Sequence, residues 1–248
     1  FRRVLFRSDP EDAKESLVNN EEWKIDYYFH FISESYFYQL YPKSFRYKKI
    51  FFGLEAQLYE NVTPFTERIM SKILNSGNVG NNKMINKLIC YMRDRSTRNP
   101  YIGYKLRTMC NNLSYVDHAS RLEQRYLNDE YPKLLQKYAG AIAATSDTPS
   151  IKYFEIPAAG CLTFMEITKE NKGEHLGYVD GKTAIFINER NYEDRFEEFL
   201  NDPNNPKWME IAAAGRDYAL KNFNNDQAVV SLIELMYSLL NRRQIGRA

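Results

Sequence analysis

The sequence contains few cysteines and histidines, and neither residue type is spaced to build a metal site. Its three cysteines, Cys90, Cys110 and Cys161, are odd in number and include no C-x-x-C pair. This pattern argues against a disulfide framework and a zinc site, and it favours a reducing, cytoplasmic compartment. The three histidines show no metal-ligand spacing, and no D-x-D triplet is available to hold a divalent cation. The sequence therefore predicts no metal centre.

Long apolar runs are also missing. No apolar stretch approaches the roughly 18 residues that a transmembrane helix needs, so we expect no membrane-spanning segment. The chain of 248 residues has 44% hydrophobic and 27% charged residues, which is ordinary for a globular protein. This length is sufficient for a sizeable core in one or two domains.

The two ends of the chain resemble a sequencing adapter translated in the open frame. One reverse translation of "FRRVLFRS", residues 1–8, contains TGCTCTTCCGAT. The reverse complement of that stretch encodes Ile-Gly-Arg-Ala, the last four residues. We interpret residues 1–8 and the tail 242–248 as artefacts, and we expect the natural gene to continue beyond this fragment. The alternative reading is a basic arm and a basic tail.

The slight basic balance does not indicate a nucleic-acid partner. Leaving out Arg2, Arg3, Arg7 and Arg247 lowers the formal net charge by four, from +2 to −2. The segment "KSFRYKK", residues 43–49, mixes basic and aromatic residues, but it leads directly into an apolar run. We therefore interpret it as the solvated entry to a strand and predict no nucleic-acid binding.

The first part of the chain predicts one strand–loop–helix unit. We expect a short strand near residues 25–32 and a second, buried strand at residues 50–52, bounded by Gly53. Thr63 and Pro64 have the residue types of a helix start. Apolar residues then follow at helical spacing: Phe65, Ile69, Ile73 and Leu74.

From residue 83 onward, helical and strand patterns follow one another. Residues 83–99 predict a helix with an apolar stripe of Met84, Leu88, Ile89 and Met92, and residues 100–130 show no clear period. Strands are then expected at residues 141–145, 161–166 and 183–188, and helices at residues 130–140, 151–160, 191–202, 206–223 and 226–240. This alternation predicts an α/β fold: a Rossmann-like parallel sheet with helices on both faces.

The segment "ATSD" marks the end of one predicted strand, where ligands of parallel sheets bind. Thr145, Ser146 and Asp147 therefore face the expected binding crevice. The helix that follows carries Lys152 in its first turn and Glu155 three residues later, on the same face. A cation and free helix amides suit a phosphate, and a carboxylate accepts two hydrogen bonds from a vicinal diol such as ribose.

The same helix ends in small residues, Ala158, Ala159 and Gly160, which allow close packing on the sheet. We interpret Glu155 as facing a nucleotide rather than the core. The alternative reading is a solvated glutamate or an ion-pair partner.

The stretch "KYFEIPAAGCLTF" resembles the hallmark of GT-B glycosyltransferases, in particular the group related to spore-maturation CgeB proteins. Asp147 and Glu155 keep the spacing of two acids that is typical of retaining GT-B families, with Asp in place of the first Glu. The downstream segments "LGYVDGKTAIFIN", "FEEFLNDP" and "AAAGRDYALKNF" also resemble this domain. They follow its order of a loop, a strand, a helix with acidic residues at short intervals, and the penultimate helix. The resemblance implies that residues 45–241 are the C-terminal, donor-binding domain and that residues 9–44 are a remnant of the N-terminal domain or a linker. The N-terminal half would then be largely missing.

The resemblance implies transfer of a sugar from a nucleotide-diphosphate donor to an unknown acceptor, with no cofactor and no essential metal. It implies that Glu155 binds the ribose, Lys152 binds the diphosphate, and Thr145, Ser146 and Asp147 lie near the sugar or phosphate. Gly53, Arg68 and Gly160 are further candidates for the donor-binding site. Two alternatives stay open: a nucleotide-sugar epimerase of GT-B type and a non-catalytic scaffold domain. Because the reaction of a GT-B enzyme takes place between two domains, we expect this fragment to bind donor without turnover.

Overall fold

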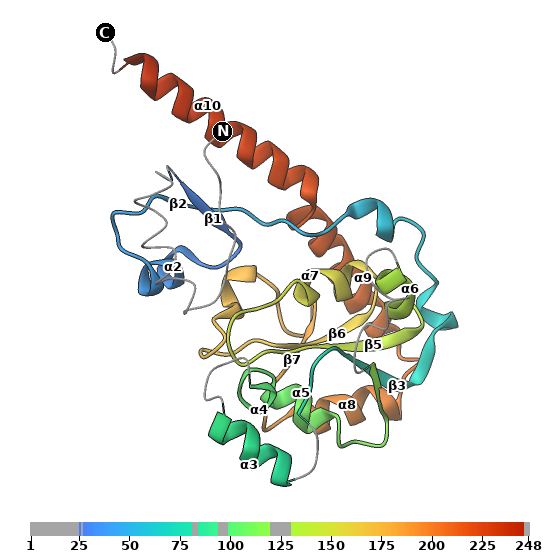
Figure 1. Cartoon of the computed structure of the whole chain (residues 1–248). Helices are drawn as coiled ribbons and strands as arrows, with labels where there is room; N and C mark the ends of the chain where they lie inside the picture. Colours follow the sequence, from blue (N-terminus) through green and yellow to red (C-terminus); the bar gives the residue numbers. More distant parts are fainter. Residues whose placement is uncertain (1–24, 26, 81–83, 94–98, 120–129, 246–248) are drawn as a thin grey trace. The chain divides into compact units, whose positions relative to one another are not determined.

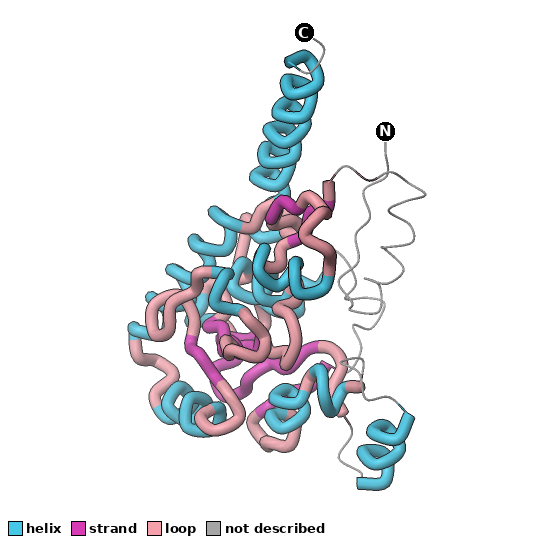
Figure 2. The backbone as a smooth tube through the Cα atoms, turned by 90° about the vertical axis from the view of Figure 1, so that its left-hand side faces the viewer, coloured by secondary structure: helices cyan, strands magenta, loops and turns pink. Residues whose placement is uncertain are grey.

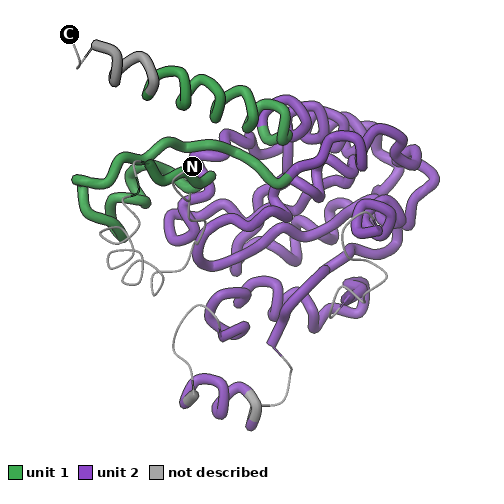
Figure 3. Tube along the Cα trace, turned by 45° about the horizontal axis from the view of Figure 1, so that its top comes forward, with its two compact units in different colours: residues 1–53, 223–248 green, residues 54–222 purple. Residues whose placement is uncertain are grey.

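The chain divides into two compact units, coloured separately in Figure 3. One comprises residues 1–53 and 223–248, and the other comprises residues 54–222. The computed structural model describes residues 25, 27–80, 84–93, 99–119 and 130–245. Residues 1–24 and 246–248 lie outside the described residues, and the interpretations of residues 1–8, 9–44 and 242–248 stay predictions.

The unit of residues 54–222 is built on a five-stranded sheet in which all neighbouring strands are parallel (Figure 1). The strands lie in the order β4-β3-β5-β6-β7. Their bounds are β3 Ile69–Ser76, β4 Val116–Ala119, β5 Tyr138–Ala143, β6 Leu162–Glu166 and β7 Ile185–Ile187. The predicted α/β fold with a parallel sheet is confirmed.

Helices cover both faces of this sheet (Figures 1 and 2). On one face α7 and α9 pack together, and α5 and α8 lie on the other. The helices of this unit are α3 Met84–Arg93, α4 Pro100–Gly103, α5 Lys105–Cys110, α6 Tyr131–Leu135, α7 Lys152–Ala158, α8 Tyr192–Asn201 and α9 Pro206–Asn222. Short 3₁₀ turns span Ala56–Tyr59, Phe65–Glu67 and Gly173–Leu176. No helix in the described ranges has the length and apolar character needed to cross a bilayer.

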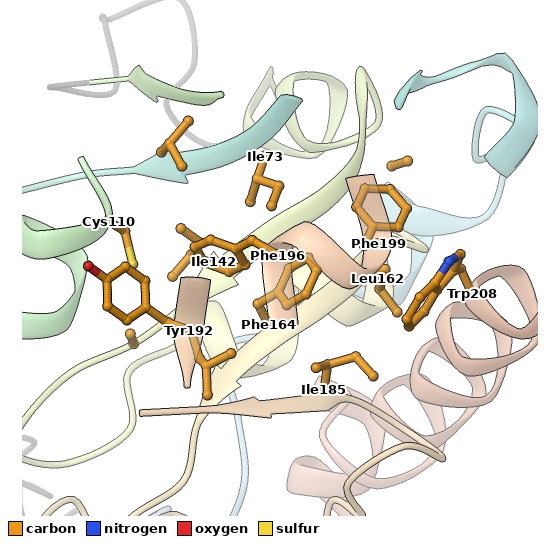
Figure 4. Close-up of a cluster of buried hydrophobic side chains, with 14 of the residues drawn as sticks. Ile73, Cys110, Ile142, Leu162, Phe164, Ile185, Tyr192, Phe196, Phe199 and Trp208 are labelled. Carbon is orange, nitrogen blue, oxygen red and sulfur yellow. The ribbon is translucent and has the colours of Figure 1, made fainter. Parts of the chain in front are cut away.

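The main core lies between the sheet and α8, with the start of α9 closing one end (Figure 4). Phe164 in the middle of β6 is fully buried and meets Phe196 and Phe199 of α8. Trp208 of α9 packs edge-on against Phe199. Strand β5 is lined with small residues and is buried over most of its length, as expected of a central parallel strand covered on both faces.

The prediction of a helix after Pro64 is wrong. Only a single 3₁₀ turn, Phe65–Glu67, follows the proline, and the chain then enters β3. Ile73 pairs with Val116 of β4 on one side and with Gly140 of β5 on the other. The last four residues of β3 are all buried, so apolar residues four apart suit this strand as well as a helix. A short apolar run therefore does not distinguish a helix from a strand.

Three further expectations need correction. The helix expected at residues 130–140 ends at Leu135, and β5 begins at Tyr138. The strand expected at residues 50–52 lies three residues earlier, at β2 Tyr47–Lys49. Ile50 directly follows it, is buried, and its amide donates to His30 O at 3.0 Å. Strand β4 was not predicted, because its four residues contain only one large apolar side chain, Val116.

The predicted helices at residues 151–160, 191–202 and 206–223 are confirmed as α7, α8 and α9, and the strands at 161–166 and 183–188 as β6 and β7. The predicted helix at residues 83–99 is confirmed over Met84–Arg93. Leu88, Ile89 and Met92 of its apolar stripe are exposed, which the spacing did not reveal.

The other unit contains a small parallel pair, β1 Tyr28–His30 with β2 Tyr47–Lys49, and the helices α2 Glu34–Leu40 and α10 Asn225–Ile245. The strand predicted near residues 25–32 and the helix predicted at 226–240 are confirmed here. An aromatic cluster of Tyr28, Phe37, Tyr41 and Phe45 holds β1 and α2 together, with the rings of Tyr28 and Phe45 stacked at 4.8 Å.

Candidate functional site

The carboxyl ends of β3, β5 and β6 meet at one edge of the sheet, because these strands are parallel neighbours. Ser76 ends β3, Thr145 follows β5 and Glu166 ends β6. Helix α7 starts at this same edge, after the loop that follows β5. The edge therefore brings together the residues that a ligand of a parallel sheet would meet.

Lys152 places its ammonium group over the end of β3. Its Nζ donates to Ser76 Oγ at 2.9 Å and to Tyr131 OH at 3.0 Å, and it lies 4.7 Å from the centre of the Tyr131 ring. Burial lowers the pKa of Lys152, the nearby Arg107 lowers it further, and Glu155 opposes both effects. An anion bound at this position would stabilise the charged form of the lysine.

Arg107 of α5 is a second cation at this edge, and sequence reasoning missed it. Its Nε donates to Asn75 Oδ1 at 3.0 Å, and its Nη2 donates to the carbonyl oxygen of Ser76. The side chain is 2% exposed, and this burial lowers its pKa. Arg107 lies in the stretch of residues 100–130 that shows no clear period, so no sequence signal linked it to the end of β3.

Gly77 lets both cations approach the same turn. It has a φ of +96°, a conformation that favours glycine. A Cβ atom here would lie 3.0 Å from Arg107 Nη2 and 3.3 Å from Lys152 Cε. A prediction of a strand at residues 69–76 would have placed Gly77 at the carboxyl edge of the sheet, because this glycine directly follows the strand.

Glu155 lies one turn beyond Lys152 on α7 and is half-buried. Its carboxylate makes no hydrogen bond or ion pair with the part of the chain that the structure describes. Burial raises its pKa, and the charge of Lys152 opposes this effect. The predicted arrangement of Lys152 and Glu155 on one turn is therefore present, with the carboxylate oxygens available to a ligand.

The loop after β5 is held in place by hydrogen bonds to neighbouring elements. Thr145 Oγ1 donates to Gly103 O at 3.2 Å, and the Ser146 amide donates to the same carbonyl at 2.9 Å. The amide of Asp147 donates to Thr145 Oγ1 at 3.4 Å, and Asn171 Nδ2 donates to Thr145 O at 3.2 Å. Residues 145–147 thus lie at the same edge of the sheet as Lys152.

The structure does not bring Arg68 and Gly160 to that edge. Arg68 precedes β3 and Gly160 precedes β6, so both lie at the amino ends of the strands. The Arg68 guanidinium donates to Thr63 O at 2.9 Å from Nε and at 2.6 Å from Nη2. Its Nη2 lies 3.0 Å from where a Cβ of Gly160 would be, so the glycine makes room for the arginine. Arg68 lies at the amino edge because residues 69–76 form a strand rather than the expected helix, and Arg68 directly precedes that strand.

Gly53 belongs to the other compact unit, and its amide donates to Asn225 Oδ1 at 2.7 Å. It was proposed because residues 50–52 were expected to be the first strand of the sheet. That premise is wrong, since the first strand of the sheet is β3.

Glu166 is a further acidic residue at the carboxyl edge that sequence reasoning missed. It is 5% exposed, and its Oε2 has no hydrogen-bond partner among the described residues. Burial raises its pKa to about 8, and the charge of Glu189 adds to this effect. Among the described residues, His, Cys, Asp and Glu side chains form no group of three that could hold a metal ion.

Comparison with known proteins supports the fold. No family model matches the sequence, and no curated protein matches it. Among solved structures, HepE from Anabaena in complex with UDP and glucose superimposes with a TM-score of 0.61 at 11% identity, over 93% of this chain and 68% of that chain. Sucrose-phosphate synthase from Thermosynechococcus elongatus matches with a TM-score of 0.58 at 12% identity, over 96% and 65% of the two chains.

TarM from S. aureus also matches, with a TM-score of 0.55 at 14% identity, over 90% of this chain and 46% of that chain. At these identities the likeness is one of fold. The chain has an α/β fold with a parallel five-stranded sheet that matches GT-B glycosyltransferases.

Proposed function

We propose that this chain is a glycosyltransferase domain that binds a nucleotide-diphosphate sugar at the carboxyl edge of its five-stranded sheet. The observation that carries the proposal is the pair on α7. Lys152 lies over the end of β3, and Glu155, one turn away, has no partner in the described part of the chain. A cation beside an available carboxylate matches a diphosphate linked to a ribose diol.

In this proposal Lys152 contacts the diphosphate and Glu155 accepts hydrogen bonds from the ribose hydroxyls. Arg107 adds a fixed positive charge behind Gly77. Residues 145–147 lie at the same edge and face the sugar or the phosphates. HepE was solved with UDP and with UDP-glucose, so uridine nucleotides are the first ligands to test here. Within the GT-B group, the stretch "KYFEIPAAGCLTF" favours the CgeB-like proteins.

Catalysis would rest on fixed charges that stabilise the departing diphosphate. Lys152 and Arg107 supply them in a buried setting, where an electrostatic interaction is stronger than in water. A scaffold domain would bind no nucleotide, and an epimerase would convert the sugar without transferring it. Titration with UDP-glucose separates a donor-binding domain, which binds it, from a scaffold domain, which does not. Where the donor is turned over, an assay for free UDP and for a glycosylated acceptor separates a transferase from an epimerase.

The Glu155→Ala variant is expected to bind UDP about 10- to 150-fold more weakly than the wild type. This corresponds to losing charge-assisted hydrogen bonds worth about 1.5–3 kcal/mol. Isothermal titration calorimetry on the whole chain measures the effect. Glu210→Ala, on the exposed surface of α9, is the matched control and should bind like the wild type. Equal affinity of Glu155→Ala and wild type would remove the ribose assignment.

UDP binding is expected to be the same in EDTA as in buffer with Mg²⁺. The described acidic residues form no metal-binding group, and the sequence has no D-x-D triplet, so the proposed contacts to the phosphates come from cationic side chains. Calorimetric titrations of UDP under the two conditions test this. Binding that is lost in EDTA and restored by Mg²⁺ or Mn²⁺ would contradict the proposed metal-independent site.

A further inference from the structure

Tyr59 is a buried tyrosine whose hydroxyl is unpaired. It ends the 3₁₀ turn Ala56–Tyr59 and is 2% exposed. The hydroxyl at the tip of its ring makes no hydrogen bond with the described part of the chain and is not enclosed by it. Tyrosine hydroxyls in buried positions usually have a hydrogen-bond partner, so an unpaired one beside a binding site points to a ligand.

Two contacts place the backbone of Tyr59 at the far end of α7, the helix that contacts both α6 and α9 (Figure 1). The carbonyl oxygen of Tyr59 accepts a hydrogen bond from Arg216 Nη2 of α9 at 2.6 Å. Arg216 Cδ in turn lies 3.6 Å from where a Cβ atom of Gly160 would be. Because Gly160 directly follows the last turn of α7, the ring of Tyr59 approaches this helix from its carboxyl end.

The carboxylate of Glu155 lies between the two ends of α7. At the start of the helix, Tyr131 OH lies 3.0 Å from Lys152 Nζ, one turn before Glu155. Burial raises the pKa of Tyr59 and of Tyr131, and the charge of Glu155 raises both further, as a nearby carboxylate does. The Tyr59 hydroxyl therefore keeps its proton at neutral pH and lies near the carboxylate that the proposed function assigns to the ribose.

We propose that Tyr59 is a further contact to the ribose of the nucleotide, with its hydroxyl donating a hydrogen bond to one of the two ribose hydroxyls that donate to Glu155. A hydroxyl group both donates and accepts hydrogen bonds, and an ionised carboxylate can only accept them. Tyr59 supplies the donor that Glu155 lacks. Together the two side chains select a ribonucleotide over a deoxyribonucleotide. This inference rests on the proposed function, since it takes the ribose to lie at Glu155.

Calorimetric titrations of the whole chain with UDP, 2′-deoxy-UDP and 3′-deoxy-UDP test the inference. The wild type is expected to bind UDP more tightly than either deoxynucleotide, because Glu155 contacts both hydroxyls. The Tyr59→Phe variant keeps the buried ring and removes only the hydroxyl. It is expected to bind UDP about 2- to 13-fold more weakly, the effect of one neutral hydrogen bond.

The deoxynucleotides separate a contact with the ribose from a structural role of Tyr59. One of them already lacks the hydroxyl that Tyr59 contacts, so Tyr59→Phe should bind that ligand as well as the wild type does. The other deoxynucleotide should lose affinity as UDP does. A merely structural role would weaken the binding of all three ligands by the same factor.

Tyr192→Phe is the matched control, because it removes the same group from another buried tyrosine. Tyr192 is 7% exposed on α8, and its hydroxyl donates to Glu193 Oε1 at 2.7 Å, outside the nucleotide site. This variant should bind all three ligands like the wild type.

Two results would overturn the role of Tyr59: equal affinity of Tyr59→Phe and the wild type for UDP, or an equal loss for all three nucleotides. If Glu155→Ala weakens UDP binding in the same series, either result removes Tyr59 alone and leaves the proposed function in place. A wild type that binds no UDP would overturn the proposed function and this inference together.

Discussion

The Phe164→Ala variant is expected to lose about 3–5 kcal/mol of its free energy of unfolding, the range measured for large aromatic-to-alanine changes in cores. Phe164 is fully buried in the middle of β6. Its ring lies 4.8 Å from that of Phe196 and 6.1 Å from that of Phe199, both in edge-to-face geometry. The variant removes these contacts and leaves a cavity between the sheet and α8. Because domains are typically stable by only 5–15 kcal/mol, the loss should be obvious.

Urea denaturation followed by circular dichroism measures this change. Met209→Ala, at a 46% exposed position, is the control and should change the stability by no more than about 0.5 kcal/mol. A loss below about 1 kcal/mol in Phe164→Ala would contradict the packing described for β6 and α8.

Gly140 on β5 offers a second test of the same contact. A Cβ atom there would lie 3.1 Å from Phe164 Cε2. Gly140→Ala alone is therefore expected to destabilise the wild type, and to be better tolerated when Phe164 is already alanine. A double-mutant cycle measures this coupling, and additive effects of the two changes would show that they do not touch.

The Glu166→Gln variant is expected to be more stable than the wild type above pH 8 and to have about the same stability below pH 4.5. The pKa of Glu166 is raised from 4.5 to about 8 by burial, with a smaller effect of Glu189. A group with a raised pKa in the folded state contributes stability that is fully present below pH 4.5. That contribution is lost as the pH rises through 8.

The difference between the two proteins should grow by roughly 3–5 kcal/mol between pH 4.5 and pH 9, at about 1.4 kcal/mol per unit of pKa shift. Urea denaturation at several pH values gives the two stability curves. Lys152 and Glu155 also titrate, but they are present in both proteins and cancel in the difference. Glu174→Gln, at an exposed position, should follow the wild-type curve. Parallel curves for Glu166→Gln and wild type would contradict the buried carboxyl described here.

The sequence by itself determined the elements with strong local signals. Residues 151–166 predict a short helix, a close turn and a buried strand, and the structure contains α7 and β6 there. The helical periodicity of residues 191–202 and 206–223 is long enough to exclude a strand. The spacing of Lys152 and Glu155 placed both on one helical face, because residues three apart are neighbours on any α-helix.

Only the tertiary structure decided which short apolar runs become strands. Ile69 to Ser76 suits a helix and a strand equally well in local pattern, and its place between β4 and β5 selects the strand. That choice sends Arg68 to the amino edge of the sheet and puts Ser76 and Gly77 beside Lys152. It also brings in Arg107, from a segment 30 residues away in sequence that has no periodic signal of its own.

The exposure of α3 was likewise undecided by the sequence. Its stripe of apolar residues has the period of a helix, and that period is the same whether the face is covered by a core or presented to solvent. Whether this face is buried depends on where the neighbouring elements lie. Tyr91 of α3 contacts Tyr101 of α4, whereas Leu88 is exposed. Local spacing therefore determined the helices and the pair on α7, whereas long-range strand pairing decided which other side chains join that pair.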